Sequence, residues 1–266
     1  MLVAALVSWS TGCASNASQT EPDDQQSRSQ PQSSADEERE SVPQLPEGAS
    51  DGPSTASLEK KCEAGAPKAC VAAGSRYANG EGVDRDKKKA ANYFERGCDG
   101  GVGEACFNLA LMYETGETLE RDLANAVKLY DRACSKGQPN ACHNLGVMYE
   151  KGEEVERDQK RARTYYADGC KQGEARSCFN LGVMYRAGRG GTADAAKSAE
   201  LFGQGCDGED WVSCYNLAVM YRNGEGVTEN PEKARSLYRR ACDNRIWAAC
   251  KNLGMMYNQG LGGEEA

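Results

Sequence analysis

Residues 134–149 read Cys-Ser-Lys-Gly-Gln-Pro-Asn-Ala-Cys-His-Asn-Leu-Gly-Val-Met-Tyr, and variants of this stretch recur along the chain every 36 residues. Each copy carries two cysteines with seven residues between them. A strict period of this length is typical of a solenoid, in which each unit is one pair of helices that buries its apolar side against neighbouring units. The cysteines of the six copies are Cys62 and Cys70, Cys98 and Cys106, Cys134 and Cys142, Cys170 and Cys178, Cys206 and Cys214, and Cys242 and Cys250.

The pattern within one copy predicts two helices and the places where they end. The first helix is expected over residues 140–151, where apolar residues recur every three or four positions. Gly152 follows it, and glycine is favoured just past a helix end because it adopts a left-handed conformation without penalty. Asp158 is a suitable N-cap for the second helix, which is expected to end at Cys170. The equivalent residues elsewhere are Gly80, Gly116, Gly188, Gly224 and Gly260, and Asp86, Asp122, Asp194 and Asn230.

The second helix of each unit repeats a small residue, an aromatic residue four positions later, and another small residue three positions after that. Small residues allow two helices to approach closely, so the aromatic ring is expected to fill the space between neighbouring helices. We interpret this pattern as core. The three series are Ala90, Ala126, Ala162, Ser198 and Ala234; Phe94, Tyr130, Tyr166, Phe202 and Tyr238; and Gly97, Ala133, Gly169, Gly205 and Ala241.

The regular cysteines allow two disulfide pairings. Joining the two cysteines of each C-x7-C pair links the end of a second helix to the start of the next first helix across one turn, which is geometrically easy. The alternative joins Cys70 to Cys98 and leaves Cys62 and Cys250 without partners, so we favour the first. Zinc ligands usually have shorter spacings and the chain has one histidine, so we expect no metal or cofactor. Disulfides would place the mature protein outside the cytosol.

The N-terminal region is expected to lie outside the fold. Residues 1–13 form a short apolar run that ends in Thr-Gly-Cys, which resembles a bacterial lipoprotein signal whose cysteine, Cys13, becomes lipidated. An ordinary secretory signal that leaves Cys13 as an odd thiol is the alternative. Residues 14–53 carry nine Asp or Glu against two Arg and hardly any aromatic residue, which predicts a disordered acidic tether.

The charge distribution limits the classes of partner. The formal net charge is −8, of which −7 lies in residues 14–53, so residues 54–266 are close to neutral. No basic patch is large enough to argue for nucleic acid. The apolar N-terminal run is too short to span a membrane, so membrane contact is expected only through a lipid anchor.

The motifs together resemble a known family. Ala-Cys-x-Asn-Leu-Gly-x-Met-Tyr, then Gly-x-Gly-Val, then Asp-x3-Ala-x3-Tyr-x3-Cys, is similar to the Sel1-like repeat, a relative of the tetratricopeptide repeat, over about residues 55–260. The C-x7-C pairs look like those of the secreted cysteine-rich proteins of Helicobacter. The resemblance implies an all-α fold, a right-handed α/α superhelical solenoid of disulfide-stapled helix pairs with a concave ligand-binding side. It also implies protein or peptide interaction, and some cysteine-rich members carry a penicillin-binding or weak β-lactamase assignment.

One register of the first helices offers a candidate binding site. Its asparagines lie roughly opposite the buried seam, and an amide both donates and accepts hydrogen bonds, as gripping an extended peptide requires. Hydrogen bonds and packing between adjacent repeats would explain the same pattern, and the sequence leaves both interpretations open. The asparagines are Asn108, Asn144, Asn180, Asn216 and Asn252, and the apolar or aromatic residues that precede four of them are Phe107, His143, Phe179 and Tyr215.

No catalytic motif is complete. His143 is the single histidine and has no evident second group in the sequence. One Ser-x-x-Lys motif occurs, at Ser57 to Lys60, without the companion motifs of penicillin-recognising enzymes. We therefore expect a non-enzymatic scaffold that binds a protein or peptide in a groove, secreted or held as a lipoprotein in the periplasm or outer membrane. The alternative, a β-lactam-binding protein or weak β-lactamase-type hydrolase, rests on the resemblance alone.

Overall fold

The computed structural model describes residues 52–152 and 155–261, and in these residues the chain forms twelve α-helices and no β-strand. The predicted signal segment at 1–13 and nearly all of the predicted tether at 14–53 lie outside the described residues. The helices are α1 (Thr55–Glu63), α2 (Pro67–Asn79), α3 (Lys87–Asp99), α4 (Gly103–Thr115), α5 (Leu123–Ser135), α6 (Pro139–Lys151), α7 (Gln159–Lys171), α8 (Ala175–Ala187), α9 (Ala195–Asp207), α10 (Trp211–Asn223), α11 (Pro231–Asp243) and α12 (Trp247–Asn258).

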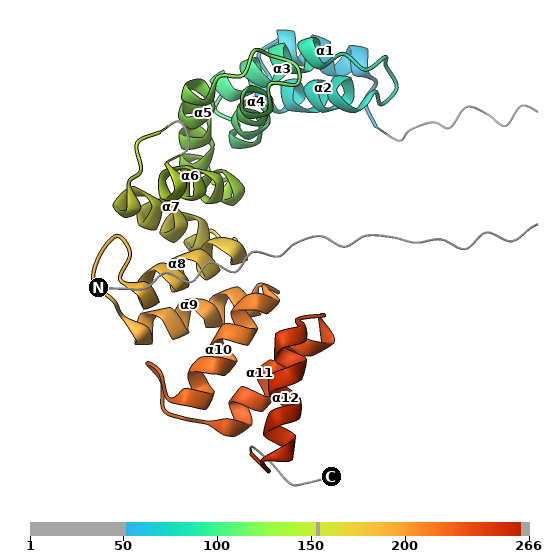
Figure 1. The fold of residues 1–266 in the computed structure, drawn as a ribbon. Coiled ribbons are helices and arrows are strands. Elements are labelled where there is room, and N and C mark those ends of the chain that lie inside the picture. The colour runs from blue at the N-terminus through green and yellow to red at the C-terminus, as the bar shows by residue number, and fades with distance from the viewer. Residues whose placement is uncertain (1–51, 153–154, 262–266) are drawn as a thin grey trace, which may run out of the picture. The chain divides into compact units, whose positions relative to one another are not determined.

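Each helix packs against the helix before it and the helix after it in the chain. Figure 1 shows this succession, in which the labels run in order from α1 to α12. The most extensive contacts are between helices joined by the longer loops, such as α2 with α3 and α6 with α7. Contacts between helices far apart in the sequence are few, so each unit is stabilised mainly by its immediate neighbours. The predicted all-α solenoid of 36-residue helix pairs is confirmed.

The predicted helix ends are confirmed with small shifts. Asp158 caps α7, and its carboxylate accepts hydrogen bonds from the backbone N–H groups of Lys160 and Arg161. Gly152 closes α6 in the left-handed conformation, with φ of 77°. The last unit departs from the prediction, because α12 ends at Asn258 and its C-cap is Gln259 rather than Gly260. The other caps that match the prediction are Asp86, Asp122, Asp194 and Asn230 at N-termini, and Gly80, Gly116, Gly188 and Gly224 at C-termini.

Six disulfides join the repeat cysteines in the C-x7-C pairing. Cys62 pairs with Cys70, and the remaining five bonds repeat this connection with Cα–Cα distances of 4.6–4.8 Å. Each bond crosses the short turn between the second helix of one unit and the first helix of the next. The alternative pairing of Cys70 with Cys98 is wrong.

The predicted core forms around the aromatic ring of each second helix. Tyr166 is 1% exposed and its ring lies against Gly146 of α6. A Cβ atom on Gly146 would lie 2.5 Å from the ring, so an added methyl group would overlap the ring at this spacing of the helices. The equivalent Gly254 on α12 has no neighbouring atom within 4 Å of where its Cβ would be, because no described helix follows α12.

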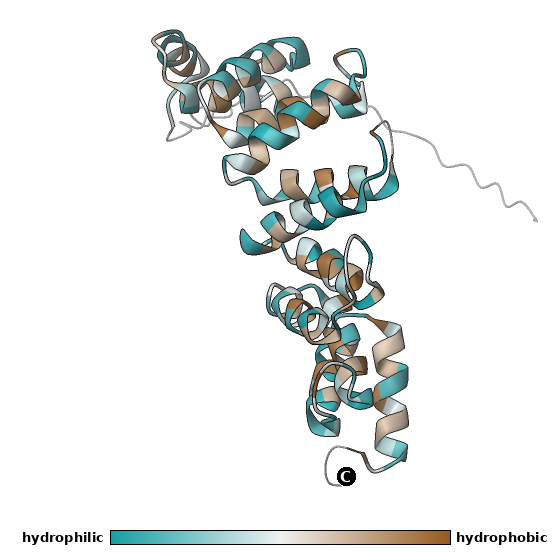
Figure 2. Cartoon of the chain, turned by 90° about the vertical axis from the view of Figure 1, so that its left-hand side faces the viewer, coloured by the Kyte–Doolittle hydropathy of each residue, from teal (hydrophilic) through white to brown (hydrophobic). Residues whose placement is uncertain are grey.

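Hydropathy is divided within each helix rather than between helices. Figure 2 shows both hydrophobic (brown) and hydrophilic (teal) segments along individual helices, as expected for helices with one buried side. The helices are 9 to 13 residues long, and none in the described part is long and apolar enough to cross a membrane.

The ring contact predicts opposite effects of one substitution at two equivalent positions. Gly146→Ala should lower the free energy of unfolding by about 1–3 kcal/mol, because the new methyl group overlaps the Tyr166 ring. Gly254→Ala should leave stability unchanged or raise it by up to about 1 kcal/mol, because alanine favours the helix and meets no atom. Thermal and urea unfolding of the oxidised protein measure both. Equal destabilisation by the two variants would contradict this account of the core.

Candidate functional site

The five predicted asparagines occupy one register of the first helices α4, α6, α8, α10 and α12. All five side chains are partly exposed. We call the surface formed by these residues and their immediate neighbours the asparagine face. What each asparagine contacts depends on the second helix beside it. The members of the register are Asn108, Asn144, Asn180, Asn216 and Asn252.

Two of the asparagines lie at hydrogen-bonded junctions between units. The hydroxyl of Tyr166 on α7 donates to Glu150 of the preceding helix at 2.9 Å, and Asn180 of the following helix lies beside the same hydroxyl. Burial and Glu150 raise the pKa of Tyr166, whereas Asn180 opposes this shift. Asn144 has the same relation to Tyr130, whose hydroxyl donates to Glu114 at 2.5 Å. These contacts favour the interpretation that Asn144 and Asn180 join repeats.

Two other asparagines lack such a partner, because the neighbouring ring has no hydroxyl group. Asn216 follows the unit of Phe202, and its amide donates instead to the carbonyl of Val212 within its own helix, at 2.8 Å. Asn108 follows the unit of Phe94, and both line a cavity of about 490 Å³ between α2 and α4. Asn108 is therefore the member of the register whose amide faces an open space.

The cavity exists because a small side chain stands at one position of α2. Ala78 occupies the register that holds Glu114 and Glu150 in the next two units and arginine in the two after those. Leu111 and Met112 of α4 contribute an apolar lining beside Asn108. Charged residues surround this lining, among them Arg85, Lys87 and Glu117, and the last two form an ion pair at 2.7 Å. The space thus combines an apolar floor, one amide and a charged rim.

The residues predicted to run beside the asparagines pack within their own units. Phe107, Phe179 and Tyr215 are partly exposed, and their rings lie against the ring of the adjoining second helix. His143 is 9% exposed, so little of its ring is open to a ligand. Each first helix is flanked by second helices on two sides, so its buried surface extends beyond the side that carries the cysteine. The ring pairs are Phe107 with Tyr130, His143 with Tyr166, Phe179 with Phe202, and Tyr215 with Tyr238, with centroids 5.8–5.9 Å apart.

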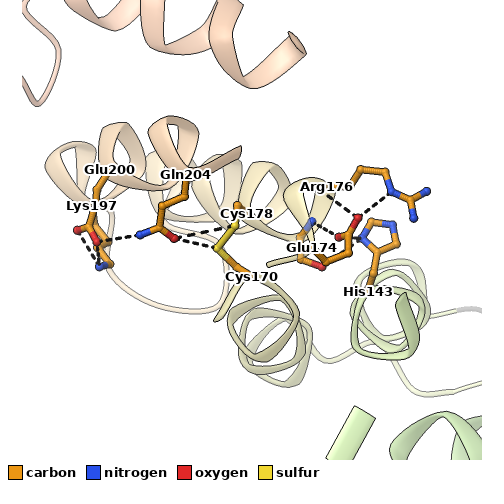
Figure 3. The surroundings of a disulfide bond; sticks show 9 residues. His143, Cys170, Glu174, Arg176, Cys178, Lys197, Glu200 and Gln204 are labelled. Atoms are coloured by element: carbon orange, nitrogen blue, oxygen red, sulfur yellow. Dashed lines mark hydrogen bonds and ion pairs between the residues drawn. A yellow bond between two sulfur atoms is a disulfide. The ribbon is translucent and has the colours of Figure 1, made fainter. Parts of the chain in front are cut away.

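His143 belongs to a buried polar junction between two units. Its Nδ1 atom lies 3.3 Å from a carboxylate oxygen of Glu174 and 3.4 Å from the Ser177 hydroxyl. Glu174 also caps α8 and accepts a hydrogen bond from the Arg176 side chain at 2.9 Å. Figure 3 shows His143, Glu174 and Arg176 converging near the disulfide between Cys170 and Cys178. Burial alone would raise the pKa of Glu174, but the hydrogen bonds from His143, Ser177 and Arg176 outweigh it and hold the pKa far below its usual range.

The described residues do not assemble a metal site or a penicillin-type catalytic centre. No three His, Cys, Asp or Glu side chains in this part of the chain converge as metal ligands would. Ser57 and Lys60 both lie on α1, where Ser57 is in the first turn that Ser54 caps and Lys60 is exposed. Ser177, although close to His143, is completely buried and so is inaccessible to a substrate.

The Glu174 junction predicts a pH-dependent contribution to stability. A carboxyl group whose pKa is lower in the folded state stabilises the fold above its unfolded pKa of about 4.3, and this contribution is lost as the pH falls below that value. Glu174→Gln should therefore lower the free energy of unfolding by about 1–3 kcal/mol at pH 7. The difference from wild type should shrink below about pH 4. Urea unfolding at several pH values measures this, with the exposed Glu95→Gln as control, and a difference that grows in acid would contradict it.

The family comparison matches the repeat units that the structure shows. The family model of the Sel1 repeat matches residues 67–102, 103–138, 139–174, 175–210, 211–245 and 247–265. Five of these segments contain one complete first helix and one complete second helix, and the sixth contains α12. No functionally curated protein matches the chain.

Several solved structures are similar. The protein c5321 of uropathogenic Escherichia coli, described as a protective antigen with an SLR fold, is 30% identical with a TM-score of 0.74; the match covers 81% of this chain and 46% of that one. This chain thus matches about half the length of c5321. A Sel1 repeat protein of Oxalobacter formigenes is 26% identical with a TM-score of 0.63, covering 76% and 81%. The cysteine-rich protein B of Helicobacter pylori is 25% identical with a TM-score of 0.42, covering 52% and 99%. With its matched repeats spanning most of the sequence, the chain belongs to the Sel1 repeat family.

Proposed function

We propose that this protein is a scaffold that binds an extended segment of a partner protein on its asparagine face, with the cavity between α2 and α4 as the principal pocket. The observation that carries this proposal is Asn108, whose amide borders a cavity of about 490 Å³. The equivalent amides of Asn144 and Asn180 lie against tyrosine hydroxyls instead. Sel1 repeat proteins generally serve in protein interaction, which supports the same class of function.

The chemistry of the cavity suits a peptide. An amide side chain can donate to a backbone carbonyl and accept from a backbone N–H of an extended chain, so Asn108 can fix the strand direction. Leu111 and Met112 offer an apolar surface for one side chain, and methionine adapts to ligands of different shape. Arg85 at the rim favours a ligand with an acidic residue beside the apolar one, whereas Lys87 is already paired with Glu117. No observation in the described residues favours the β-lactam alternative.

The location of the protein follows in part from its cysteines. Six disulfides indicate an extracytoplasmic protein, because such bonds persist in oxidising compartments. We further propose that Cys13 is lipidated and that residues 14–53 tether the solenoid to a membrane of the cell envelope, in the periplasm or at the outer membrane. The support is the apolar run that precedes Cys13 and the acidic, aromatic-poor composition that follows it.

Substitutions in the cavity should weaken binding without unfolding the protein. We would select peptides from a displayed random library on the oxidised full chain and then measure their affinities. Leu111→Asp should weaken the binding of selected peptides at least tenfold, because it places a charge on the apolar lining. Asn108→Ala should weaken their binding about fivefold through the loss of hydrogen bonds. Asn92→Ala, at an exposed position of α3, is the matched control. Unchanged affinity with Leu111→Asp would remove this cavity from the binding site.

The lipid anchor is tested separately in cells. Cys13→Ser should move the protein from the membrane fraction to the soluble fraction, because the lipid would be attached to the Cys13 thiol. Metabolic labelling with an alkynyl fatty acid should mark the wild-type protein and not the variant. Labelling of both, or membrane association that survives the substitution, would show that Cys13 is not the anchor.

A further inference from the structure

The junction between α10, α11 and α12 differs from the equivalent junctions in one respect. Tyr238 of α11 is completely buried, yet no group among the described residues accepts a hydrogen bond from its hydroxyl. Tyr130 and Tyr166 stand in the same register, and each donates its hydroxyl hydrogen to a glutamate of the preceding helix. A buried donor without an acceptor costs free energy. The fifth unit therefore presents a donor that its own chain leaves unused.

The difference arises because the glutamate of that register is replaced by a cation. Arg222 of α10 stands where Glu114 and Glu150 stand in the second and third units. Its guanidinium donates to no carboxylate in the described part of the chain; it donates instead to the side-chain oxygen of the adjacent Asn223 at 3.2 Å. Glu225, the nearest carboxylate along the sequence, is paired with Arg186 of α8.

Three hydrogen-bond donors thus meet at this junction from three helices. Arg222 stands in the register whose glutamates lie 2.5 and 2.9 Å from the equivalent tyrosine hydroxyls, and Asn252 stands in the register of Asn144 and Asn180, so both groups lie near the phenol. Burial raises the pKa of the Tyr238 hydroxyl, and the charge of Arg222 and the amide of Asn252 oppose that shift. Arg222 is partly exposed, and so is Asn252. The cluster of guanidinium, phenol and amide contains no acceptor that carries a negative charge.

We propose that the Arg222–Tyr238–Asn252 junction binds a carboxylate of the peptide ligand, either the side chain of an aspartate or glutamate or the carboxylate at a chain end. This inference deepens the proposed function and rests on it. The ligand carboxylate would occupy the place that the carboxylates of Glu114 and Glu150 occupy in the earlier units, where each accepts the tyrosine hydroxyl. Arg222 would supply a charge-assisted pair, and Asn252 a further donor.

In this proposal the buried hydroxyl is reached by movement of the Arg222 side chain. The Arg222 side chain is tied only to the neighbouring Asn223, so its long arm can move as the ligand enters. A bound carboxylate gains hydrogen bonds from Tyr238 and Arg222 at once, and the unpaired donor is satisfied. Charge-assisted bonds of this kind are stronger than neutral ones. No change of the helices themselves is required.

The test is a nuclear magnetic resonance titration of the oxidised full chain with three short probes. The first is pentaglutamate blocked at both ends, the second is pentaglutamine blocked at both ends, and the third is pentaglutamine with a free C-terminal carboxylate. We expect the side-chain amide of Asn252 and the ring signals of Tyr238 to shift with the first or the third probe and not with the second. Which carboxylate probe acts distinguishes an acidic side chain from a chain end.

Two variants connect the signal to the proposed groups. Arg222→Glu introduces the carboxylate that the earlier units carry. It should therefore raise the melting temperature and weaken binding of the carboxylate probe at least tenfold. Tyr238→Phe should weaken binding of the carboxylate probe severalfold and leave the melting temperature unchanged or higher, because its hydroxyl donates no hydrogen bond that would be lost. Tyr166→Phe is the matched control and should lower the melting temperature, since it removes a hydrogen bond to Glu150.

The outcomes separate this inference from the proposed function. Absence of a shift with both carboxylate probes, or an affinity that Arg222→Glu leaves unchanged, would overturn the carboxylate site. If Leu111→Asp still abolishes the binding of library peptides in that case, the peptide-binding function stands without it. If Arg222→Glu abolishes binding and Leu111→Asp does not, the carboxylate site is supported and the α2–α4 cavity loses its assigned role.

Discussion

The structure depends on the contact between the aromatic ring of each second helix and the small residue of the preceding first helix. The ring of Tyr166 lies against Gly146 so closely that a single methyl group would not fit. This contact sets the distance between the two helices of a unit. It also fixes the direction of the ring, so that the hydroxyl at its far end points to the edge where the following unit begins. The hydrogen bonds at the edges of some units and the open space at the edges of others follow from that placement.

The disulfides hold the second kind of junction, between a second helix and the next first helix. These helices contact each other less extensively than the two helices within a unit. In the chain-entropy model a closed loop of nine residues contributes roughly 2.5 kcal/mol, so each bond reinforces the less extensive junction. With four Phe and three Trp in 266 residues, the chain has few large side chains for a core. Tight ring contacts within units and covalent bonds between them compensate for that composition.

The repeat made the fold predictable, whereas the site depended on contacts that one repeat does not contain. The period, the caps, the core rings and the disulfide pairing all follow from patterns within 36 residues, and the structure confirms them. The register of asparagines was also visible, but the role of each depends on whether tyrosine or phenylalanine stands in the preceding second helix. The burial of His143 was not visible in the sequence, because it depends on second helices that pack on two sides of the first helix. Comparing Ala78 with the larger residues that occupy the same position in the following units would have indicated the cavity.

That register shows how a repeat protein can specialise without changing its fold. Because every unit places the same position at the same edge, the side chain there decides what the edge does. Alanine at position 78 leaves a cavity, the glutamates at 114 and 150 accept the tyrosine hydroxyls, and arginine at 222 leaves a hydroxyl without a partner. The junctions at Tyr130 and Tyr166, where the hydroxyl is bound by a glutamate of the same chain, lie between the cavity near one end of the solenoid and the Arg222 junction near the other. A ligand that follows the asparagine face would therefore meet different chemistry at its two ends, and the order of the repeats would determine its direction.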